Sequence, residues 1–324
     1  MQLQYSRQVL GSTGLEVSPV GLGAAELGFE VTDEKIADAL IGAALDAGVN
    51  VIDTAAMYSD SEEKIGRALK GRRNQILLFT KCGLFPPPRQ SAIGFALRTE
   101  RKIKRALGLS HGCQSLDWHP RALEWDINES LRKMNTDYID LIQLHSCSEE
   151  ILRQGEVIEV LQKARAAGKV RHIGYSSDGN ATAYAIQTGV FETVQVAVNI
   201  ADQKPIDEVL PLASKYGVGV IVKRPLANCL WQSSRRPSMD QHQAYWDRLQ
   251  ALKYKFLYGP CAVDFALRFA LSLPEVQTVL VGTTSPVHLK QAAARASEPL
   301  SKDEFQAIRN RWREVAQPDW NEQI

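Results

Sequence analysis

Short runs of hydrophobic residues alternate with amphipathic stretches along most of the chain. The amphipathic stretches carry apolar side chains at helical spacing and lie at residues 32–47, 62–69, 127–134, 156–167, 207–216 and 286–294. Thr32 is a candidate N-cap of the first predicted helix, and Gly48 and Gly168 stand where two helices are expected to end. Eight short hydrophobic runs are typical of buried strands and lie at residues 20–23, 49–53, 76–81, 138–145, 170–175, 193–198, 218–223 and 278–282.

This alternation predicts an α/β protein built on a parallel sheet. Eight buried strands separated by helices favour closure of that sheet into a (β/α)8 barrel, a TIM barrel. An open doubly wound sheet is the alternative, but the first strand ends in Gly21-Leu22-Gly23 without the G-x-G-x-x-G that opens a dinucleotide-binding helix. Residues 7–10 and 15–18 flank a glycine-rich turn and predict a β-hairpin ahead of the barrel. We expect one domain over residues 1–324.

Two segments, residues 83–125 and 225–260, are too long for ordinary connections. Both follow predicted strands, so in a barrel they are extended loops over the C-terminal, catalytic face. The first contains Pro86-Pro87-Pro88 and a basic group that we interpret as the solvated face of a helix: Arg98, Arg101, Lys102, Lys104 and Arg105. We expect the walls of a substrate pocket to include Glu26, Phe85, Trp118, Trp231 and Trp320.

The composition is that of an ordinary globular enzyme, with 44% hydrophobic residues, 23% charged residues and a formal net charge of +1. This charge provides no field that would attract nucleic acid or an anionic membrane, so we expect neither as a partner. The chain has no apolar run near the length of a membrane span, and its N-terminus does not resemble an export signal. Five cysteines without a C-x-x-C pair indicate reduced thiols, and we expect a cytoplasmic protein. The composition leaves its oligomeric state open.

Polar residues end three consecutive predicted strands. Asp53 ends the second strand, Lys81 the third and His145 the fourth, and Tyr58 follows Asp53 by five residues. Barrel enzymes carry their chemistry at these strand ends, and adjacent strands are ~5 Å apart, so the four side chains are expected to converge. Each residue alone has an ordinary structural explanation, but four such residues at one end of the barrel favour a catalytic function.

The segments that carry these residues resemble the aldo-keto reductase family. Residues 50–59 (NVIDTAAMYS) and 61–69 (SEEKIGRAL) are similar to the family signature around its aspartate and tyrosine. Residues 78–81 (LFTK) resemble the strand of the catalytic lysine, and residues 131–145 (LRKMNTDYIDLIQLH) the stretch that delivers the histidine. The resemblance covers about residues 10–295 and implies a catalytic tetrad of Asp53, Tyr58, Lys81 and His145.

The tetrad suits the reduction of an aldehyde or ketone, or the oxidation of an alcohol or sugar, by an NAD(P)-dependent oxidoreductase. Reduction needs a hydride at carbon and a proton at oxygen, and a phenol of normal pKa near 10 is a poor donor and base at neutral pH. We expect Lys81 to lower the pKa of Tyr58, Asp53 to hold Lys81, and His145 to orient the carbonyl. A nicotinamide dinucleotide would supply the hydride.

The resemblance also implies where that dinucleotide lies. Ser176, Ser177 and Gln195 match positions that hold the carboxamide, with Ser177 replacing the usual asparagine. Lys223 stands where the family often has an aromatic residue that stacks on nicotinamide, and its methylenes could cover one face of the ring. Arg224, followed by Pro225 and Leu226, is a candidate ligand of the pyrophosphate, although Lys223 and Arg224 could be no more than rim cations. The adenosine half would contact the turn after strand eight through Gly282, Thr283, Thr284, Ser285, His288 and Gln291.

The same turn bears on the choice between NAD and NADP. Many family members carry Lys or Arg there for the 2′-phosphate, whereas this chain has Gly282 and His288 at those places. A histidine that is largely neutral at pH 7 pairs poorly with a dianion, so we expect NAD to be used at least as readily as NADP. Lys290 is a possible substitute for the missing cation.

Other functions were weighed against this one. His111, Cys113, His119 and Cys147 include metal-ligand types, but their spacing matches no known site, and the first strand lacks the His-x-His of a metal-dependent barrel hydrolase. Cys82 and Cys147 adjoin tetrad residues and are interpreted as packed thiols rather than redox centres. A non-enzymatic dinucleotide-binding regulatory subunit on the same fold remains the alternative to an enzyme. The physiological substrate and the direction of the reaction are not predicted.

Overall fold

Eight parallel strands form a closed barrel in the computed structural model, which describes residues 5–31, 33–85 and 115–320. Around the barrel the order is β3, β4, β5, β8, β9, β10, β11, β12 and back to β3. The predicted barrel is confirmed, and the open doubly wound sheet is wrong. The strands are β3 (Val20–Gly23), β4 (Val51–Asp53), β5 (Leu77–Cys82), β8 (Ile139–His145), β9 (Val170–Ser176), β10 (Thr193–Ala197), β11 (Gly219–Lys223) and β12 (Val276–Gly282).

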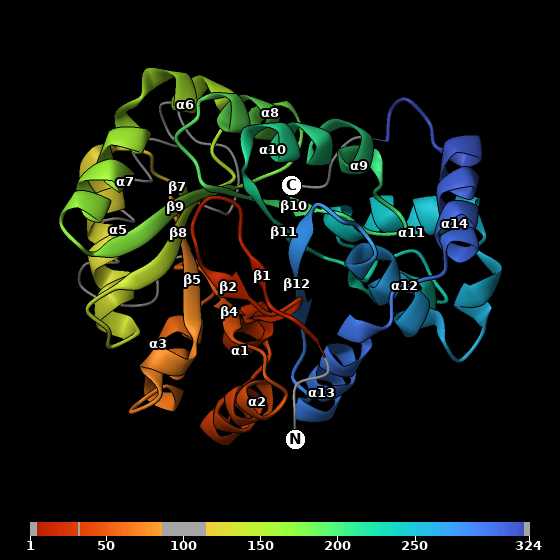
Figure 1. The fold of residues 1–324 in the computed structure, drawn as a ribbon, viewed down its shortest axis with the longest axis horizontal. Coiled ribbons are helices and arrows are strands. Elements are labelled where there is room, and N and C mark those ends of the chain that lie inside the picture. The colour runs from red at the N-terminus through yellow and green to blue at the C-terminus, as the bar shows by residue number, and fades with distance from the viewer. Residues whose placement is uncertain (1–4, 32, 86–114, 321–324) are drawn as a thin grey trace.

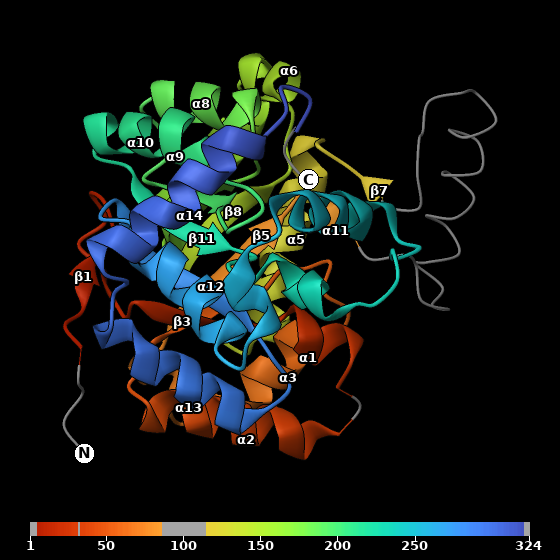
Figure 2. The same cartoon turned by 90° about the vertical axis from the view of Figure 1, so that its right-hand side faces the viewer.

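Helices surround the barrel, and the largest hydrophobic cluster fills the layer between the two (Figure 1). A second cluster lies among α11, α12 and α14. Helices α2 and α13 lie side by side below the barrel in Figures 1 and 2. The helices are α1 (Ala25–Phe29), α2 (Glu34–Asp46), α3 (Ser61–Ala68), α5 (Pro120–Lys133), α6 (Glu149–Gln154), α7 (Glu156–Ala166), α8 (Asn180–Gln187), α9 (Lys204–Glu208), α10 (Leu210–Tyr216), α11 (Asp240–Leu252), α12 (Ala262–Leu271), α13 (Pro286–Ala294) and α14 (Lys302–Val315).

The predicted N-terminal hairpin closes one end of the barrel. Strands β1 (Gln8–Val9) and β2 (Glu16–Val17) pair antiparallel, and Figure 2 shows β1 on the opposite side of the barrel from α11. Hairpin side chains pack against the lowest inward-facing layer of the barrel strands, which consists of apolar residues. The cluster contains Leu10, Leu15 and Val17 from the hairpin and Val51, Phe79, Leu141, Ile221 and Leu280 from the strands.

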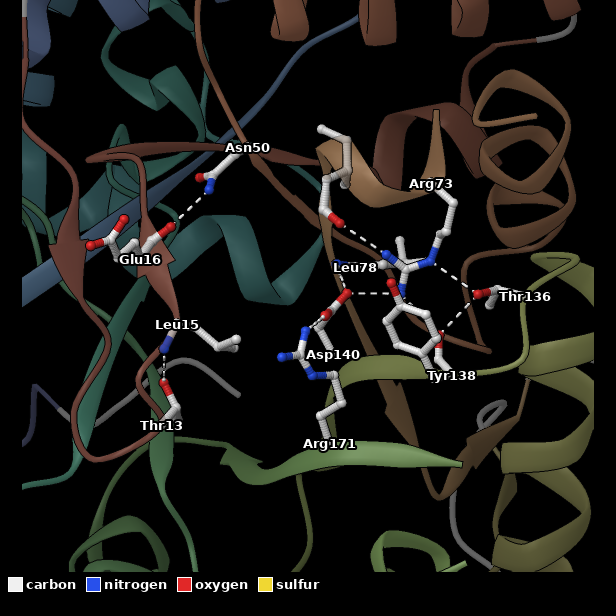
Figure 3. A network of polar contacts seen from close by, with 11 residues as sticks. Thr13, Leu15, Glu16, Asn50, Arg73, Leu78, Thr136, Tyr138, Asp140 and Arg171 are labelled. Carbon is white, nitrogen blue, oxygen red and sulfur yellow. Dashed lines mark hydrogen bonds and ion pairs between the residues drawn. The ribbon is translucent and has the colours of Figure 1, made fainter. Parts of the chain in front are cut away.

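A buried carboxylate ties strands together at the same end of the barrel (Figure 3). Asp140 is 1% exposed and pairs with Arg73 at 2.7 Å and with Arg171 at 2.9 Å. It also accepts a hydrogen bond of 2.9 Å from the backbone N–H of Leu78 on β5. These contacts make the closed end of the barrel a rigid base for the opposite end.

Alternation along the strands separates this apolar layer from a polar one. Residues two apart on a strand face the same side, so each inward apolar residue is followed by an inward residue nearer the C-terminal end. Val51 is thus followed by Asp53, Phe79 by Lys81, and Leu141 by Gln143 and then His145. The fold therefore collects polar side chains at the C-terminal mouth of the barrel.

Several local predictions differ from the structure. The N-cap of α2 is Asp33, whose side chain accepts from the N–H of Lys35, so the proposal of Thr32 was wrong. Helix α5 begins at Pro120, inside the segment predicted as a long loop, and α11 lies within the other. The predicted helix 207–216 is two short helices, α9 and α10. The expectations for Pro86-Pro87-Pro88, the basic group of residues 98–105, His111 and Cys113 lie outside the described residues.

Candidate active site

The four predicted tetrad residues meet at the C-terminal mouth of the barrel. The Lys81 ammonium is paired with the Asp53 carboxylate and donates a hydrogen bond of 2.9 Å to the carbonyl oxygen of Thr54. Lys81 Nζ lies 5.3 Å from the centroid of the Tyr58 ring, and the Tyr58 and His145 rings stand edge to face with centroids 6.0 Å apart. The structure thus brings together a phenol, an ammonium, a carboxylate and an imidazole.

Asp53 is held by more than its lysine. Gln143 Nε2 and Gln195 Nε2 each donate a hydrogen bond of 3.2 Å to the Asp53 carboxylate, one to each oxygen. Gln143 was not among the residues predicted from the sequence. Its place in the polar layer, two residues before His145 on the same strand, is the signal that could have found it.

Tyr58 is positioned by the backbone of α1. Tyr58 lies in the turn between β4 and α3, and its carbonyl oxygen accepts a hydrogen bond of 2.9 Å from the backbone N–H of Ser61. Gly28 packs directly on this turn, because a Cβ built at Gly28 would lie 1.9 Å from the Tyr58 carbonyl oxygen. The Phe29 ring packs edge to face with the Tyr58 ring, with centroids 5.8 Å apart, and is itself 60% exposed.

Lys81 lowers the pKa of Tyr58 as predicted, but burial raises it by more. Burial raises the pKa of Tyr58 above its ordinary value, and Lys81 opposes this rise without reversing it. The expected net lowering of the Tyr58 pKa was therefore wrong, because desolvation of the phenolate outweighs the nearby ammonium. Burial by itself would lower the pKa of Lys81, but the Asp53 charge and the Tyr58 phenol raise it overall. Lys81 thus remains charged within the barrel.

His145 is a neutral imidazole in this environment. Burial holds its pKa well below the ordinary value, and the charges of Lys81, Lys223 and Arg224 add to that effect. Its Nδ1 atom is buried and has no hydrogen-bond partner among the described residues. A neutral ring has one N–H donor and one acceptor, so this side chain can hydrogen-bond an uncharged oxygen without changing its protonation state.

Ser176 and Gln195 each have a buried polar atom without a hydrogen-bond partner in the described part of the chain. Ser176 Oγ lies at the end of β9, and Gln195 Oε1 lies on β10, the adjacent strand. A hydroxyl and an amide oxygen suit a carboxamide, which both donates and accepts hydrogen bonds. Ser177 differs, because it is buried and hydrogen-bonds the Tyr175 phenol. The residues present therefore fit a nicotinamide through Ser176 and Gln195.

Lys223 is anchored by a residue that sequence reasoning missed. Its ammonium pairs with the buried carboxylate of Asp178 at 2.8 Å, and Asp178 also accepts a hydrogen bond of 2.7 Å from the N–H of Ala197. This anchoring holds the lysine stem at the mouth of the barrel. The neighbouring Arg224 has a positive φ of 54°, and its carbonyl oxygen accepts from Asn199 Nδ2 at 3.0 Å. Pro225 is buried and Leu226 half-buried beside them.

The turn after β12 leads into α13. Ser285 is the N-cap of that helix and accepts from the N–H of His288 at 3.4 Å, while the Thr283 hydroxyl accepts from the N–H of Ser285 at 3.1 Å. Thr284 is half-buried, and His288 and Gln291 are exposed. Lys290, the candidate substitute for the missing cation, pairs with Asp46 of α2 at 3.0 Å, and both side chains of this pair are exposed.

The other expected pocket residues are placed as follows. Glu26 lies on α1 near the site, and Trp118 covers Gly83 just after β5. Trp231 and Trp320 pack against the second hydrophobic cluster. The side chain of Phe85 is not among those that the structure describes.

The candidate metal ligands and the two cysteines beside the tetrad form no reactive centre in residues 5–31, 33–85 and 115–320. Within these residues no group of three or more His, Cys, Asp or Glu side chains is arranged to hold a metal ion. Cys82 and Cys147 are buried and free, and burial raises the pKa of each thiol, so both are poor nucleophiles at neutral pH.

Among the described helices, none combines the length and hydropathy that a transmembrane segment requires.

Comparisons with known proteins agree with this geometry. A model described as "Aldo/keto reductase family" matches residues 19–313. An L-galactose dehydrogenase of Arabidopsis thaliana is 29% identical over 90% of this chain and 88% of its own length. An NADH-specific methylglyoxal reductase of Escherichia coli is 26% identical over 90% of this chain and 94% of its own. The holo form of an aldo-keto reductase from Bacillus halodurans superimposes with a TM-score of 0.79, at 27% identity, over 98% of this chain and 99% of its own. The alternative of a non-enzymatic subunit finds no support in these relatives.

Proposed function

We propose, from the premise that this chain belongs to the aldo/keto reductase family, that it interconverts a carbonyl compound and its alcohol with Tyr58 as the proton donor and acceptor. The observation that carries this proposal is the convergence of Tyr58, Lys81, Asp53 and His145 at one end of the barrel. NAD or NADP supplies or receives the hydride when bound. The roles of the four side chains follow from their chemistry.

His145 positions the oxygen of the substrate. A neutral imidazole donates one hydrogen bond, which orients the carbonyl without adding a permanent charge. Tyr58 then gives its proton to that oxygen during reduction and takes it back during oxidation. Burial keeps the phenol protonated in the resting state, which suits the donor role. The 6.0 Å between the two ring centroids allows both groups to reach one oxygen atom.

Lys81 stabilises the charge that Tyr58 acquires. When the phenol loses its proton, the ammonium faces a phenolate, and this attraction lowers the barrier to proton transfer. Asp53 keeps Lys81 protonated, and the glutamines on Asp53 hold that carboxylate in place. Lys81 and Asp53 therefore act through Tyr58.

The cofactor residues are assigned on the same basis. Ser176 Oγ and Gln195 Oε1 would hold the carboxamide, because both atoms are buried without a partner in the described chain. The Lys223 stem, held by Asp178, would cover the ring, and Arg224 would contact the pyrophosphate. Ser177, Pro225 and Leu226 contribute shape rather than hydrogen bonds. The turn Gly282, Thr283, Thr284 and Ser285, with His288 and Gln291 on α13, would contact the adenosine half.

The substrate is proposed to be a small aldehyde, ketone, alcohol or sugar. The names of two relatives, an L-galactose dehydrogenase and a methylglyoxal reductase, support this range. The half-exposed apolar face of Phe29 beside Tyr58 gives such a substrate an apolar contact next to the proton donor. We propose the cytoplasm as its location, in keeping with the free state of the four described cysteines.

The substitution Tyr58→Phe tests the proposal, because it removes the transferable proton and little else. Turnover of a panel of aldehydes, ketones, sugars and alcohols, followed through the absorbance of reduced nicotinamide, should fall by about 10²–10⁴-fold. The dissociation constant for the dinucleotide should change by less than about twofold. Tyr216→Phe, at the exposed end of α10, is the matched control and should retain full turnover. Undiminished turnover in Tyr58→Phe would refute the assignment.

A further inference from the structure

A carboxylate occupies the space beside Gly282 on the turn proposed for the dinucleotide. A Cβ built at Gly282 would lie 2.3 Å from Glu26 Oε1 and 2.6 Å from Glu26 Oε2. Glu26 belongs to α1, directly after β3, and β3 and β12 are paired so that Gly23 is opposite Gly282. The absence of a side chain at Gly282 therefore gives the Glu26 carboxylate its place.

This carboxylate is not neutralised by a neighbouring cation in the described structure. Glu26 Oε2 is buried and has no hydrogen-bond partner among the described residues. Burial raises the pKa of Glu26, a hydrogen bond from its own backbone opposes that rise, and Glu30, the residue after α1, adds to it. The charge of Glu26 also adds slightly to the rise in the Tyr58 pKa that burial causes. An unsatisfied buried acceptor of this kind favours a ligand that brings a donor.

The charge at this position is opposite to the one expected for NADP. The resemblance described above implies a lysine or arginine in this turn in many family members, and Gly282 is one of the places where this chain lacks it. In this structure the Glu26 carboxylate lies where a side chain at position 282 would begin. Lys290, the candidate replacement, pairs with Asp46 at 3.0 Å.

We propose that Glu26 selects NAD over NADP by accepting a hydrogen bond from a ribose hydroxyl and repelling the 2′-phosphate. The inference rests on the proposed function, since it requires the dinucleotide to lie along the β12 turn. Carboxylates perform the same task in dinucleotide-binding proteins of a different fold, where Asp or Glu binds the ribose 2′-hydroxyl of NAD. Here the carboxylate comes from the opposite end of the chain and reaches the turn because β3 and β12 close the barrel.

The test compares dissociation constants for NAD⁺ and NADP⁺, measured by calorimetry or by quenching of tryptophan fluorescence. The wild-type protein should bind NAD⁺ at least about tenfold more tightly than NADP⁺, since like charges in contact are costly. Glu26→Gln keeps the shape and removes the charge. It should strengthen NADP⁺ binding by about tenfold or more and change NAD⁺ binding by less than about threefold. Retained NAD⁺ affinity also shows that the variant is folded.

Two further variants sharpen the result. Glu26→Gln combined with Gly282→Lys restores a cation at the turn and should reverse the preference in favour of NADP⁺. Glu30→Gln removes an exposed charge from the residue after α1 and should leave both constants within about twofold of the wild type. An unchanged NAD⁺/NADP⁺ ratio in Glu26→Gln, with binding intact, would overturn the role of Glu26 alone. Failure of the wild-type protein to bind either dinucleotide would overturn the proposed function as well.

Discussion

Gly28→Ala is expected to impair catalysis through the position of Tyr58, although Gly28 contributes no side chain to the site. The added Cβ would lie 1.9 Å from the Tyr58 carbonyl oxygen, 2.7 Å from its carbonyl carbon and 3.3 Å from Ser61 Cβ. Backbone atoms cannot turn away as the end of a flexible side chain can. The turn that carries Tyr58 must therefore move relative to α1.

The required movement can be estimated from the structure. Cβ atoms essentially never approach other heavy atoms more closely than 3.0 Å, so the carbonyl oxygen must shift by at least 1.1 Å, the difference between 3.0 and 1.9 Å. A displacement of about 1 Å at a reacting group costs about 10²-fold in rate, or ~2.7 kcal/mol of transition-state stabilisation. The overpacking should also cost about 1–3 kcal/mol of folding stability. We expect kcat to fall about 10²-fold.

The assay measures kcat for aldehyde reduction well below the unfolding temperature, together with thermal unfolding of each variant. Gly42→Ala on α2 is the matched control, because nothing lies within 4 Å of a Cβ built there. That control should keep full activity and gain about 0.5–1 kcal/mol of stability. In a Tyr58→Phe background, Gly28→Ala should have little further effect on kcat, because both changes act on one proton transfer. A folded Gly28→Ala protein with wild-type kcat would refute the reasoning.

Two other predictions concern charge. Because burial raises the pKa of Tyr58, the reduction rate should stay level through neutral pH and fall only as pH rises through that raised pKa, whereas alcohol oxidation should increase over the same alkaline range. His145 is neutral throughout, so a limb in the kcat/KM profile near 6.5, the ordinary histidine pKa, would contradict the assignment. Asp178→Asn removes the charge that anchors Lys223, and the dinucleotide dissociation constant should rise by about three- to tenfold. Asp247→Asn, which breaks the exposed pair with Arg236, should leave the dinucleotide dissociation constant unchanged. Equal dissociation constants in the Asp178→Asn and Asp247→Asn proteins would count against the anchoring role of Asp178.

The barrel and the meeting of the tetrad could be predicted from the sequence because both depend on local regularities. Each buried strand is a short hydrophobic run, and a polar residue at its end is visible in the sequence itself. Asp53, Lys81 and His145 then converge because β4, β5 and β8 are adjacent, as the prediction required. Helix ends were harder to place. Helix α5 starts at Pro120, several residues before the first strongly apolar stretch, so hydrophobic periodicity alone placed its beginning too late.

The remaining features depend on distances between residues far apart in the chain. The balance between burial and the Lys81 charge at Tyr58 could not be weighed without knowing how deeply the phenol lies, and the simple expectation of a lowered pKa failed for that reason. The pairing of Asp178 with Lys223 joins the segment after β9 to β11, although β10 lies between these two strands. The contact of Glu26 with Gly282 exists only because the first and last strands of the barrel are neighbours.

The arrangement of charge explains how one site can suit both the cofactor and the reacting oxygen. Lys81 and Lys223 each have a buried carboxylate partner, Asp53 and Asp178, so two lysines enter the barrel mouth at a modest electrostatic cost. Burial holds the pKa of His145 well below its ordinary value, and the charges of Lys81, Lys223 and Arg224 lower it further and favour negative charge at the centre of the mouth. In the proposed mechanism, negative charge develops there on the Tyr58 oxygen during reduction. In the role proposed for Glu26, its carboxylate beside Gly282 opposes negative charge at the rim, so the site would favour a transient anion at its centre and disfavour the 2′-phosphate of NADP at its edge.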